Sequence, residues 1–306
     1  MSIVILGVFA ADCAFRGQRL PSMGETVLGE GFALGPGGKG SNQAVAASRA
    51  GGDVHFVTRL GRDIFADMAR DVWGQAGVTP HVTEDADSYT GAAFIYVNAD
   101  SGDNAIIVAP GAGGQLSPAD IDAHAALIGG AAVFVTQLEQ PMEAAHRALQ
   151  LARDGGARTI LNPAPAAEIP DAMLALCDVI TPNESEAEIL TGIAVASVDD
   201  AKRAADALLD RGVGAAIITL GENGALYRDR DTTLHVAAIR AGAVVETTGA
   251  GDAFNGGFAA ALARGDSPAD AVRFGNATAA LSVTRAGAAA SMPDGHEIVA
   301  LLSRQG

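Results

Sequence analysis

The sequence predicts an α/β fold, a three-layer sandwich in which helices cover both faces of a mainly parallel central sheet, with a small β-sheet lid. Two observations predict the sandwich. Short apolar runs rich in β-branched residues alternate with Ala-rich amphipathic segments, and Ser and Gly residues stand at expected helix boundaries. A third observation, two strand-like stretches without an intervening helix, predicts the lid.

The central strands are expected where the apolar runs recur: residues 3–9, 55–61, 131–139, 158–165, 178–183 and 215–221. Amphipathic helices, such as residues 141–156 and 199–212, lie between them. Ser117 and Ser267 each precede a proline, as an N-cap precedes an N1 proline, and Gly155 and Gly212 stand where helices are expected to end.

The lid is expected from two excursions, about residues 14–37 and 89–110, within a single domain spanning residues 1–306. The second excursion reads as a hairpin whose turn is formed by residues 98–104. Its apolar side chains exceed what a monomeric flap would leave in water, which predicts an oligomer formed through the lids; they are Phe94, Ile95, Ile106 and Ile107.

The composition excludes several classes of protein. Against 20 Lys and Arg stand 36 Asp and Glu, and the net charge of −16 disfavours nucleic acid and anionic membranes as partners. Only Cys13 and Cys177 occur, without metal-site spacing, so neither a disulfide framework nor a zinc site is expected. The apolar start lacks a basic n-region and no run is long enough to span a bilayer, so a cytoplasmic location is expected.

A glycine loop at residues 35–43, GPGGKGSNQ, fits one phosphate-binding motif and fails another. Gly35, Gly37 and Gly40 satisfy G-x-G-x-x-G, and a helix-like run at residues 42–50 follows, which leaves an NAD-binding oxidoreductase as one hypothesis. A P-loop is excluded because Gly40, not Ser or Thr, follows Lys39 and no Gly stands at the first position of the motif.

A second glycine turn, at residues 246–265, runs directly into an apolar helix with Asp252 at the junction. Gly249 and Gly251 allow backbone N–H groups to converge at a helix N-terminus, which creates a site for anionic oxygen. Asp252 is either a base that deprotonates a hydroxyl or simply the N-cap of the helix, and the residue alone does not decide between them.

Five further segments stand in a recognisable order: residues 35–44, 162–166 (NPAPA), 181–192 (TPNESEAEILTG), 219–221 (TLG) and 283–293 (VTRAGAAASMP). Together with TTGAGDAFNGG they resemble the ribokinase-like (pfkB) family of sugar kinases over essentially the whole chain. The resemblance implies that the early glycine loop binds sugar and the later turn faces the nucleotide phosphates. It makes the oxidoreductase, and equally a non-catalytic sugar-binding regulator, remote alternatives.

The resemblance implies a role for each matching residue. Asp252 is expected to be the general base, beside an anion hole formed by Gly249, Ala250 and Gly251. Sugar-binding roles are implied for Asp12, Gly38, Lys39, Asn42, Glu139 and Asp252. ATP-binding roles are implied for Asn183, Thr219, Gly221, Gly251 and Asn276. Glu186 is expected to organise Mg²⁺, largely through water, and homodimers through the lids are frequent in the family.

Two departures from the family pattern bear on substrate and activation. Ala10 stands where ribokinases usually carry Asn, so one hydrogen bond to the sugar is missing. Ribose phosphorylated at O5 is the expected substrate, and 2-deoxyribose or another sugar of the same family is the alternative. Glu246 replaces a common Asp in a site for activating K⁺, whose other members are Thr248, Ser282, Arg285, Gly287 and Ser291.

Overall fold

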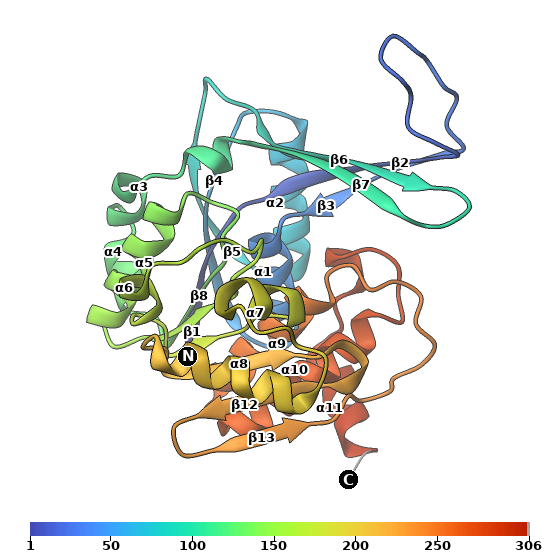
Figure 1. The fold of residues 1–306 in the computed structure, drawn as a ribbon. Coiled ribbons are helices and arrows are strands. Elements are labelled where there is room, and N and C mark those ends of the chain that lie inside the picture. The colour runs from blue at the N-terminus through green and yellow to red at the C-terminus, as the bar shows by residue number, and fades with distance from the viewer. Residues whose placement is uncertain (305–306) are drawn as a thin grey trace.

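The computed structural model describes residues 1–304, and its main feature is a nine-stranded sheet with helices on both faces (Figure 1). The strand order is β13-β12-β11-β10-β9-β8-β1-β4-β5. Their bounds are β1 Ser2–Leu6, β4 Asp53–Leu60, β5 Thr79–Glu84, β8 Val133–Thr136, β9 Arg158–Leu161, β10 Val179–Ile180, β11 Ala215–Thr219, β12 Ala225–Asp229 and β13 Thr233–Val236. All pairs are parallel except those made by β12 and β13, so the predicted mainly parallel sheet is confirmed.

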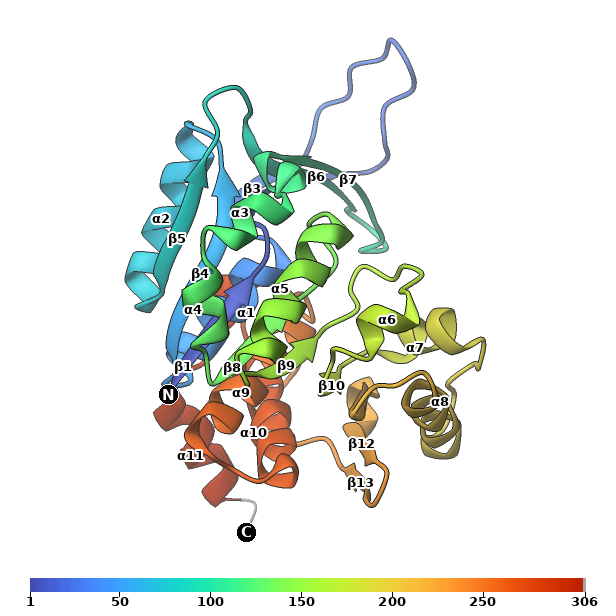
Figure 2. The same cartoon turned by 90° about the vertical axis from the view of Figure 1, so that its left-hand side faces the viewer.

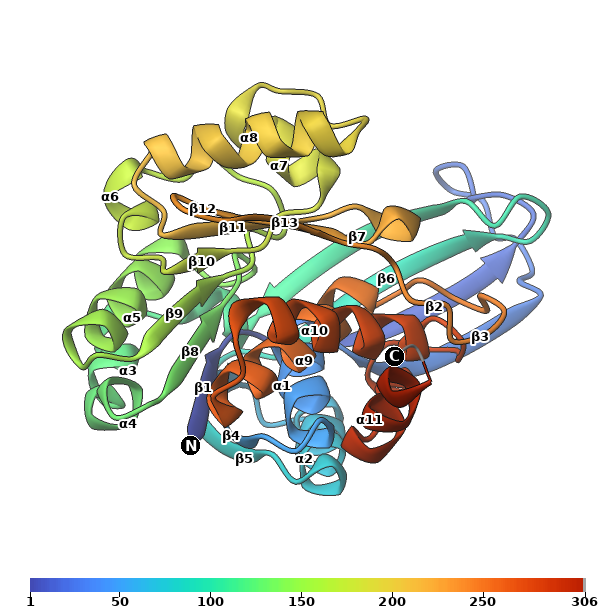
Figure 3. The same cartoon turned by 90° about the horizontal axis from the view of Figure 1, so that it is seen from below.

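Successive side chains along each strand point to opposite faces of the sheet, so two separate hydrophobic cores form, one on each face. Ile3 and Ile5 of β1 face one core, while Val4 and Leu6 face the other. The first core is covered by α1 Lys39–Arg49, α2 Ile64–Ala76, α9 Ala250–Arg264, α10 Pro268–Ser282 and α11 Gly295–Ser303. The second is covered by α3 Pro118–Asp122, α4 Ala125–Gly129, α5 Met142–Asp154, α6 Asp171–Leu174, α7 Glu184–Thr191 and α8 Val198–Asp210. Figure 3 shows these three layers from below, with α7 and α8 on one side of the strands and α9 and α10 on the other.

The helix boundaries follow the sequence with two corrections. Ser117 and Ser267 cap α3 and α10 as predicted, and Gly212 follows α8 in the left-handed region, with φ 102°. Gly155 ends α5 with φ −80°, and it is Gly156 that takes the positive φ. The reason for Gly155 is steric, because a Cβ there would lie 2.1 Å from the carbonyl oxygen of Gly129. The helix expected at residues 42–50 begins earlier, at Lys39.

A second, four-stranded sheet projects from the sandwich, with the order β3-β2-β6-β7 (Figure 1). Its strands are β2 Ala10–Gly17, β3 Gly31–Gly37, β6 Thr90–Asn98 and β7 Asn104–Gly111. This sheet therefore begins at Ala10, earlier than the expected residue 14, and residues 24–30 belong to no strand. In Figure 2 its strands extend away from the helices of the main body.

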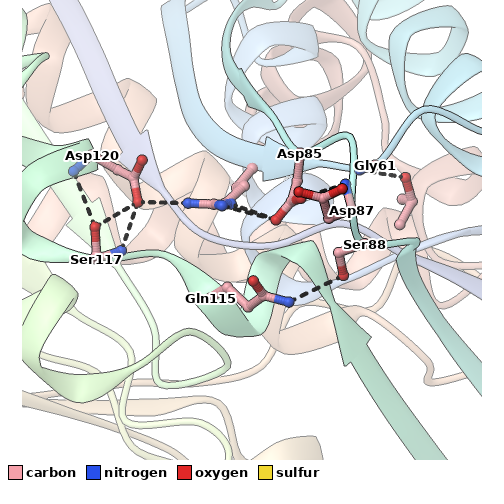
Figure 4. Close-up of polar contacts among 9 residues, drawn as sticks. Gly61, Asp85, Asp87, Ser88, Gln115, Ser117 and Asp120 are labelled. Atoms are coloured by element: carbon pink, nitrogen blue, oxygen red, sulfur yellow. Dashed lines mark hydrogen bonds and ion pairs between the residues drawn. The ribbon is translucent and has the colours of Figure 1, made fainter.

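The two chain segments that join β6 and β7 to the main body meet at one ion-pair cluster (Figure 4). Arg59, in β4, donates to Asp85 Oδ2 at 2.8 Å and to Asp120 Oδ2 at 3.1 Å, on either side of the hairpin. Gln115 Nε2 donates to Ser88 Oγ at 3.2 Å across the same two segments. Arg59 and its partners thus form one attachment of the second sheet to the main body, beside the packing of α2 against β2, β3 and β6.

Among residues 1–304, the structure contains no helix with the length and apolarity that a bilayer crossing requires.

Candidate active site

Asp252 lies in the first turn of α9 with its carboxylate buried. The helix begins at Ala250, and its N-cap is Gly249, which has φ 77° and makes no side-chain cap bond. Asp252 instead accepts hydrogen bonds from Asn42 Nδ2 and Gln43 Nε2, each at 3.0 Å. Its carboxylate therefore does not cap α9.

Close packing of α1 against α9 brings these side chains together. A Cβ on Gly256 would lie 2.4 Å from the Cβ of Ala46, so only glycine allows the helices to approach this closely. At that separation, short amides near the start of α1 reach the carboxylate on α9. The packing of the first core thus positions Asn42 and Gln43 over Asp252.

The early glycine loop connects β3 to α1 beside Asp12. A Cβ on Gly37 would lie 2.3 Å from Asp12 Oδ2, and a Cβ on Gly38, whose φ is 90°, would lie 2.5 Å from the carbonyl oxygen of Val8. Lys39, the first residue of α1, donates its backbone N–H to Glu139 Oε2 at 2.7 Å. The loop therefore gathers Asp12, Lys39 and Glu139 next to Asp252.

The dinucleotide interpretation of this loop is wrong. Gly35 and Gly37 lie in β3, an antiparallel edge strand of the second sheet, whereas the fingerprint requires a turn after the first strand of a βαβ unit. Gly35 has no atom within 4 Å of its would-be Cβ, so no close packing demands glycine there.

Burial dominates the electrostatics of these acids. Burial raises the pKa of Glu139 to about 7, against the opposing influence of Lys39. Burial and the neighbouring charge of Asp252 raise the pKa of Asp12 to about 6. The pKa of Asp252 is also raised by burial, while Lys39 and the amides of Asn42 and Gln43 pull it down. The site is thus a cluster of coupled carboxylates with one nearby ammonium group.

A pocket of about 700 Å³ lies at the start of α9 and contains all five residues expected to bind ATP. They are Asn183, Thr219, Gly221, Gly251 and Asn276. One wall is apolar, formed by Ile239, Phe254, Ala279, Ala280 and Val283. Ala250 and Gly251 also line it, so the pocket reaches the turn that leads to Asp252.

The glycine turn offers N–H groups toward this pocket. Ala250 N–H donates to Thr247 O at 3.1 Å within the turn. Gly251 lies in the first turn of α9, where a helix leaves its N–H groups without carbonyl partners and carries partial positive charge. Of the three residues expected to form the anion hole, Ala250 thus uses its N–H within the turn.

Asn183 and Glu186 form a capping box at the start of α7. Asn183 Oδ1 accepts from Glu186 N–H, and Glu186 Oε2 accepts from Asn183 N–H, both at 2.9 Å. Burial raises the pKa of Glu186. Among residues 1–304 no group of three or more His, Cys, Asp and Glu side chains is placed to hold a metal ion. This donor set fits Mg²⁺ only as an ion carried largely by water and ligand phosphates, the usual arrangement for Mg²⁺.

Asn276 has a structural contact as well as a place in the pocket. Its Nδ2 donates to Val236 O at 3.2 Å and Ala237 O at 3.4 Å, which fastens α10 to the end of β13.

Glu246 connects the segment before the glycine turn to the loop after α10. Its Oε2 accepts from Gly287 N–H at 2.8 Å, and its own N–H donates to Val283 O at 3.2 Å. Ser291 is fully buried in the same loop, whereas the Arg285 side chain pairs with Glu297, so only the Arg285 backbone could face a cation.

Four buried polar residues near Asp252 carry no role in the sequence-based interpretation: Gln43, Gln137, Asn162 and Asn255. Gln43, Asn162 and Asn255 lie inside the quoted motifs, as polar residues in segments that are otherwise mainly apolar or glycine-rich. That contrast was the available signal. Their partners come from other elements, so the sequence alone did not pair them.

Comparison with known proteins assigns the family. Residues 1–295 match the pfkB family of carbohydrate kinases. A ribokinase of Haemophilus influenzae is 39% identical over 302 residues, 98% of each chain. A deoxyribokinase of Salmonella typhi is also 39% identical, over 297 residues and 96% of each chain. The structure of Arabidopsis thaliana ribokinase complexed with ribose and ATP superposes with a TM-score of 0.92 at 30% identity, covering 98% of each chain. The chain therefore belongs to the pfkB family of carbohydrate kinases.

Proposed function

We propose that this carbohydrate kinase transfers the γ-phosphoryl group of ATP to the primary hydroxyl of a pentose, converting D-ribose to D-ribose 5-phosphate. The buried carboxylate of Asp252 carries the proposal, because it lies in the first turn of α9, beside a pocket that reaches the same turn. Phosphoryl transfer requires such a base, a positioned nucleophile and charge stabilisation. The ribokinase relatives support ribose as acceptor and ATP as donor.

On the sugar side, Asp12 and Glu139 accept hydrogen bonds from hydroxyls, while Lys39, Gly38 and Asn42 contact the ring. Asn42 Oδ1 is buried without a protein partner in the described chain, so it is free to accept from a hydroxyl. The second sheet, which carries Asp12, covers the sugar and excludes water.

In the reaction, Asp252 takes the proton of the attacking hydroxyl as its oxygen bonds to the γ-phosphorus, and the bond from that phosphorus to the bridging oxygen breaks, so that ADP leaves. The N–H groups of Gly249 and Gly251 stabilise the negative charge that develops on the phosphoryl oxygens, while the Ala250 N–H holds the turn through Thr247 O. Asn183, Thr219, Gly221 and Asn276 hold the nucleotide in the pocket. Glu186 orients the waters of a Mg²⁺ ion, which when bound neutralises phosphate charge.

The second candidate acceptor is 2-deoxyribose. Ala10 provides no hydrogen bond where ribokinases usually have Asn, and a deoxyribokinase is as similar to this chain as a ribokinase is. A pocket that makes one fewer hydrogen bond discriminates less against a sugar that lacks the hydroxyl.

Two further features belong to the proposal. K⁺ binds between Glu246, Ser291 and backbone oxygens near Thr248, Ser282, Arg285 and Gly287, and orders the glycine turn. The protein forms a homodimer through the second sheets, whose apolar side chains are exposed: Phe94 by 38%, Ile106 by 54% and Ile107 by 68%. Dependence on ATP and two free thiols agree with a cytoplasmic enzyme.

An assay that couples ADP release to a reporter, run across a panel of sugars, tests the proposal. Ribose is expected to give the highest kcat/KM, and 2-deoxyribose the next. If none of the sugars in the panel causes release of ADP, sugar-kinase activity toward these acceptors is overturned. A preference for 2-deoxyribose would establish the second candidate.

A further inference from the structure

A closed network of buried side chains surrounds Asp252 and connects it to the glycine turn. Gln43 Nε2 donates to Asp252 Oδ1 and to Asn162 Oδ1, both at 3.0 Å. Asn162 Nδ2 in turn donates to the backbone carbonyl of Thr181 at 3.1 Å. All of these side chains are at most 6% exposed.

The network returns to the start of α9 through a second branch. Thr181 Oγ1 donates to Asn255 Oδ1 at 2.7 Å, and Asn255 Nδ2 donates to Gly251 O at 2.9 Å. Residues from α1, the end of β9, the end of β10 and α9 thus form one ring. The carboxylate and the glycine turn are thus joined through one network of buried side chains.

The backbone carbonyl of Thr181 determines which way each amide points. A carbonyl oxygen can only accept, so Asn162 presents its NH₂ group to Thr181 and its oxygen to Gln43. Gln43 must then present its own NH₂ group, whose two hydrogens serve Asn162 and Asp252. Its oxygen is occupied by Gln137 Nε2 at 2.6 Å.

A reversed Gln43 amide would place its oxygen against two acceptors and its NH₂ group against the NH₂ group of Gln137. Each buried mismatch of this kind leaves polar groups without hydrogen-bond partners, so the observed orientation is locked. Asn42, by contrast, has an unpartnered oxygen and no such anchor.

We propose that Gln43 is a positioning residue that keeps Asp252 a hydrogen-bond acceptor for the sugar hydroxyl, and that Asn162 and the Thr181 carbonyl fix the Gln43 amide in its donating orientation. This inference rests on the proposed function of Asp252 as the base. A proton on Asp252 Oδ1 would face the Gln43 NH₂ group, where no oxygen can receive it. The network of Gln43, Asn162 and Thr181 therefore favours the ionised form of Asp252 before phosphoryl transfer. After transfer, it favours release of the proton that Asp252 has accepted.

The test compares Gln43→Met, Gln43→Glu and a matched control, Gln140→Met. Gln140 is also a buried amide, 4% exposed, but donates to Thr136 Oγ1 and Gln137 O and does not contact Asp252. Both Met variants are expected to lower the melting temperature. Only changes at Gln43 are expected to alter the pH dependence of catalysis.

As the pH is lowered, kcat/KM of Gln43→Met is expected to begin to fall at a higher pH than that of the wild type, because the loss of one hydrogen bond to a charged group makes Asp252 bind its proton roughly tenfold more tightly. Gln43→Glu is an isosteric change that places a second acid beside Asp252. Its kcat/KM is expected to fall more than that of Gln43→Met as the pH is lowered. It provides the test if the Met variant does not fold. Parallel pH profiles for Gln43→Glu and the wild type would overturn the proposal.

A readout without substrate separates this inference from the proposed function. In ligand-free protein carrying ¹³Cγ-labelled aspartate, the Asp252 signal is the one lost in Asp252→Asn. Its titration midpoint is expected to rise in the Gln43 variants and to stay unchanged in Gln140→Met. If the wild type phosphorylates no sugar, the proposed function fails, yet the titration still tests the network of Gln43, Asn162 and Thr181. Coincident titrations in Gln43→Glu and the wild type would leave Gln43 with a purely structural role.

Discussion

Asn42 and Asp252 stand 210 positions apart in the chain and are joined by a 3.0 Å hydrogen bond from Nδ2 to Oδ2. The bond unites the early glycine loop, which leads into α1, with the late glycine turn, which leads into α9. Sugar-side and phosphate-side residues therefore meet at one carboxylate.

Replacing Asp252 by Asn is expected to lower kcat by roughly 10²–10⁴-fold, because the base is lost while the size of the side chain is kept. Sugar affinity, measured by calorimetry, is expected to change much less. Because the Asp252 side chain does not cap α9, any fall in melting temperature would come from its hydrogen bonds with Asn42 and Gln43 and not from a lost helix cap. Wild-type turnover in this variant would remove Asp252 from the role of base.

Stability of the ligand-free protein is expected to decrease as pH rises from about 4.5 to 7. Asp12 shifts from its ordinary pKa of 3.8 to about 6 on folding, and Glu139 from 4.5 to about 7. In that window the folded state binds more protons than the unfolded chain, so raising the pH favours unfolding. Each group contributes at most about 1.4 kcal/mol per pH unit, less where solvent screens it.

Urea unfolding at several pH values measures this slope. Asp12→Asn and Glu139→Gln should each flatten it over the interval in which that residue titrates. An identical slope in both variants and the wild type would show that these carboxyls do not carry the effect.

Ala10→Asn is expected to raise kcat/KM for ribose relative to 2-deoxyribose, by up to about 10–100-fold. Ala10 and Asp12 are two residues apart in β2, so their side chains share a face of the second sheet. Ala10→Leu, whose side chain has the same number and branching of heavy atoms as Asn without the amide, is the control and should affect both sugars alike. An unchanged ratio in Ala10→Asn would mean that position 10 does not contact the differing hydroxyl.

Activity is expected to be higher in K⁺ than in a bulky organic cation such as tetramethylammonium. The contact from Glu246 to Gly287 N–H places a carboxylate beside the segment that leads to the glycine turn, where an ion can order the N–H groups of Gly249 to Gly251. Glu246→Gln should reduce turnover in K⁺ to the level that the wild type shows in tetramethylammonium. Equal turnover of the wild type in both salts would contradict the proposal that K⁺ binds at Glu246.

The protein is expected to be a dimer in light scattering at micromolar concentration, and Ile107→Glu is expected to make it a monomer. Ile107 is 68% exposed on β7, the edge strand of the second sheet, so a charge there opposes burial in an interface. Glu at the equally peripheral Val299, 54% exposed on α11, is the control and should leave the dimer intact. A wild-type monomer with full activity would refute the interface.

Six parallel strands of the large sheet could be predicted because burial on both faces demands continuous apolar runs, such as residues 215–221. The parallel edge strand β5 and the antiparallel strands β12 and β13 were missed, because their short, mixed sequences, TPHVTE, ALYRD and TLHV, carry no such run. The glycine motifs located the two halves of the site. The orientation of the Gln43 amide could not be predicted. It depends on the hydrogen bond from Asn162 to the Thr181 carbonyl, and these three residues come together only in the folded chain.

The Arg59 cluster lies at the end of the second sheet that adjoins the main body, and it supports the sheet there, while the opposite end of β6 and β7 projects away. Because Arg59 ties Asp85 to Asp120, a small rotation at this support becomes a larger displacement at the far end of β6 and β7. Substitutions at the support can therefore change how tightly a sugar is enclosed while every sugar contact is preserved. Natural variation in sugar affinity within such a scaffold need not arise in the binding pocket.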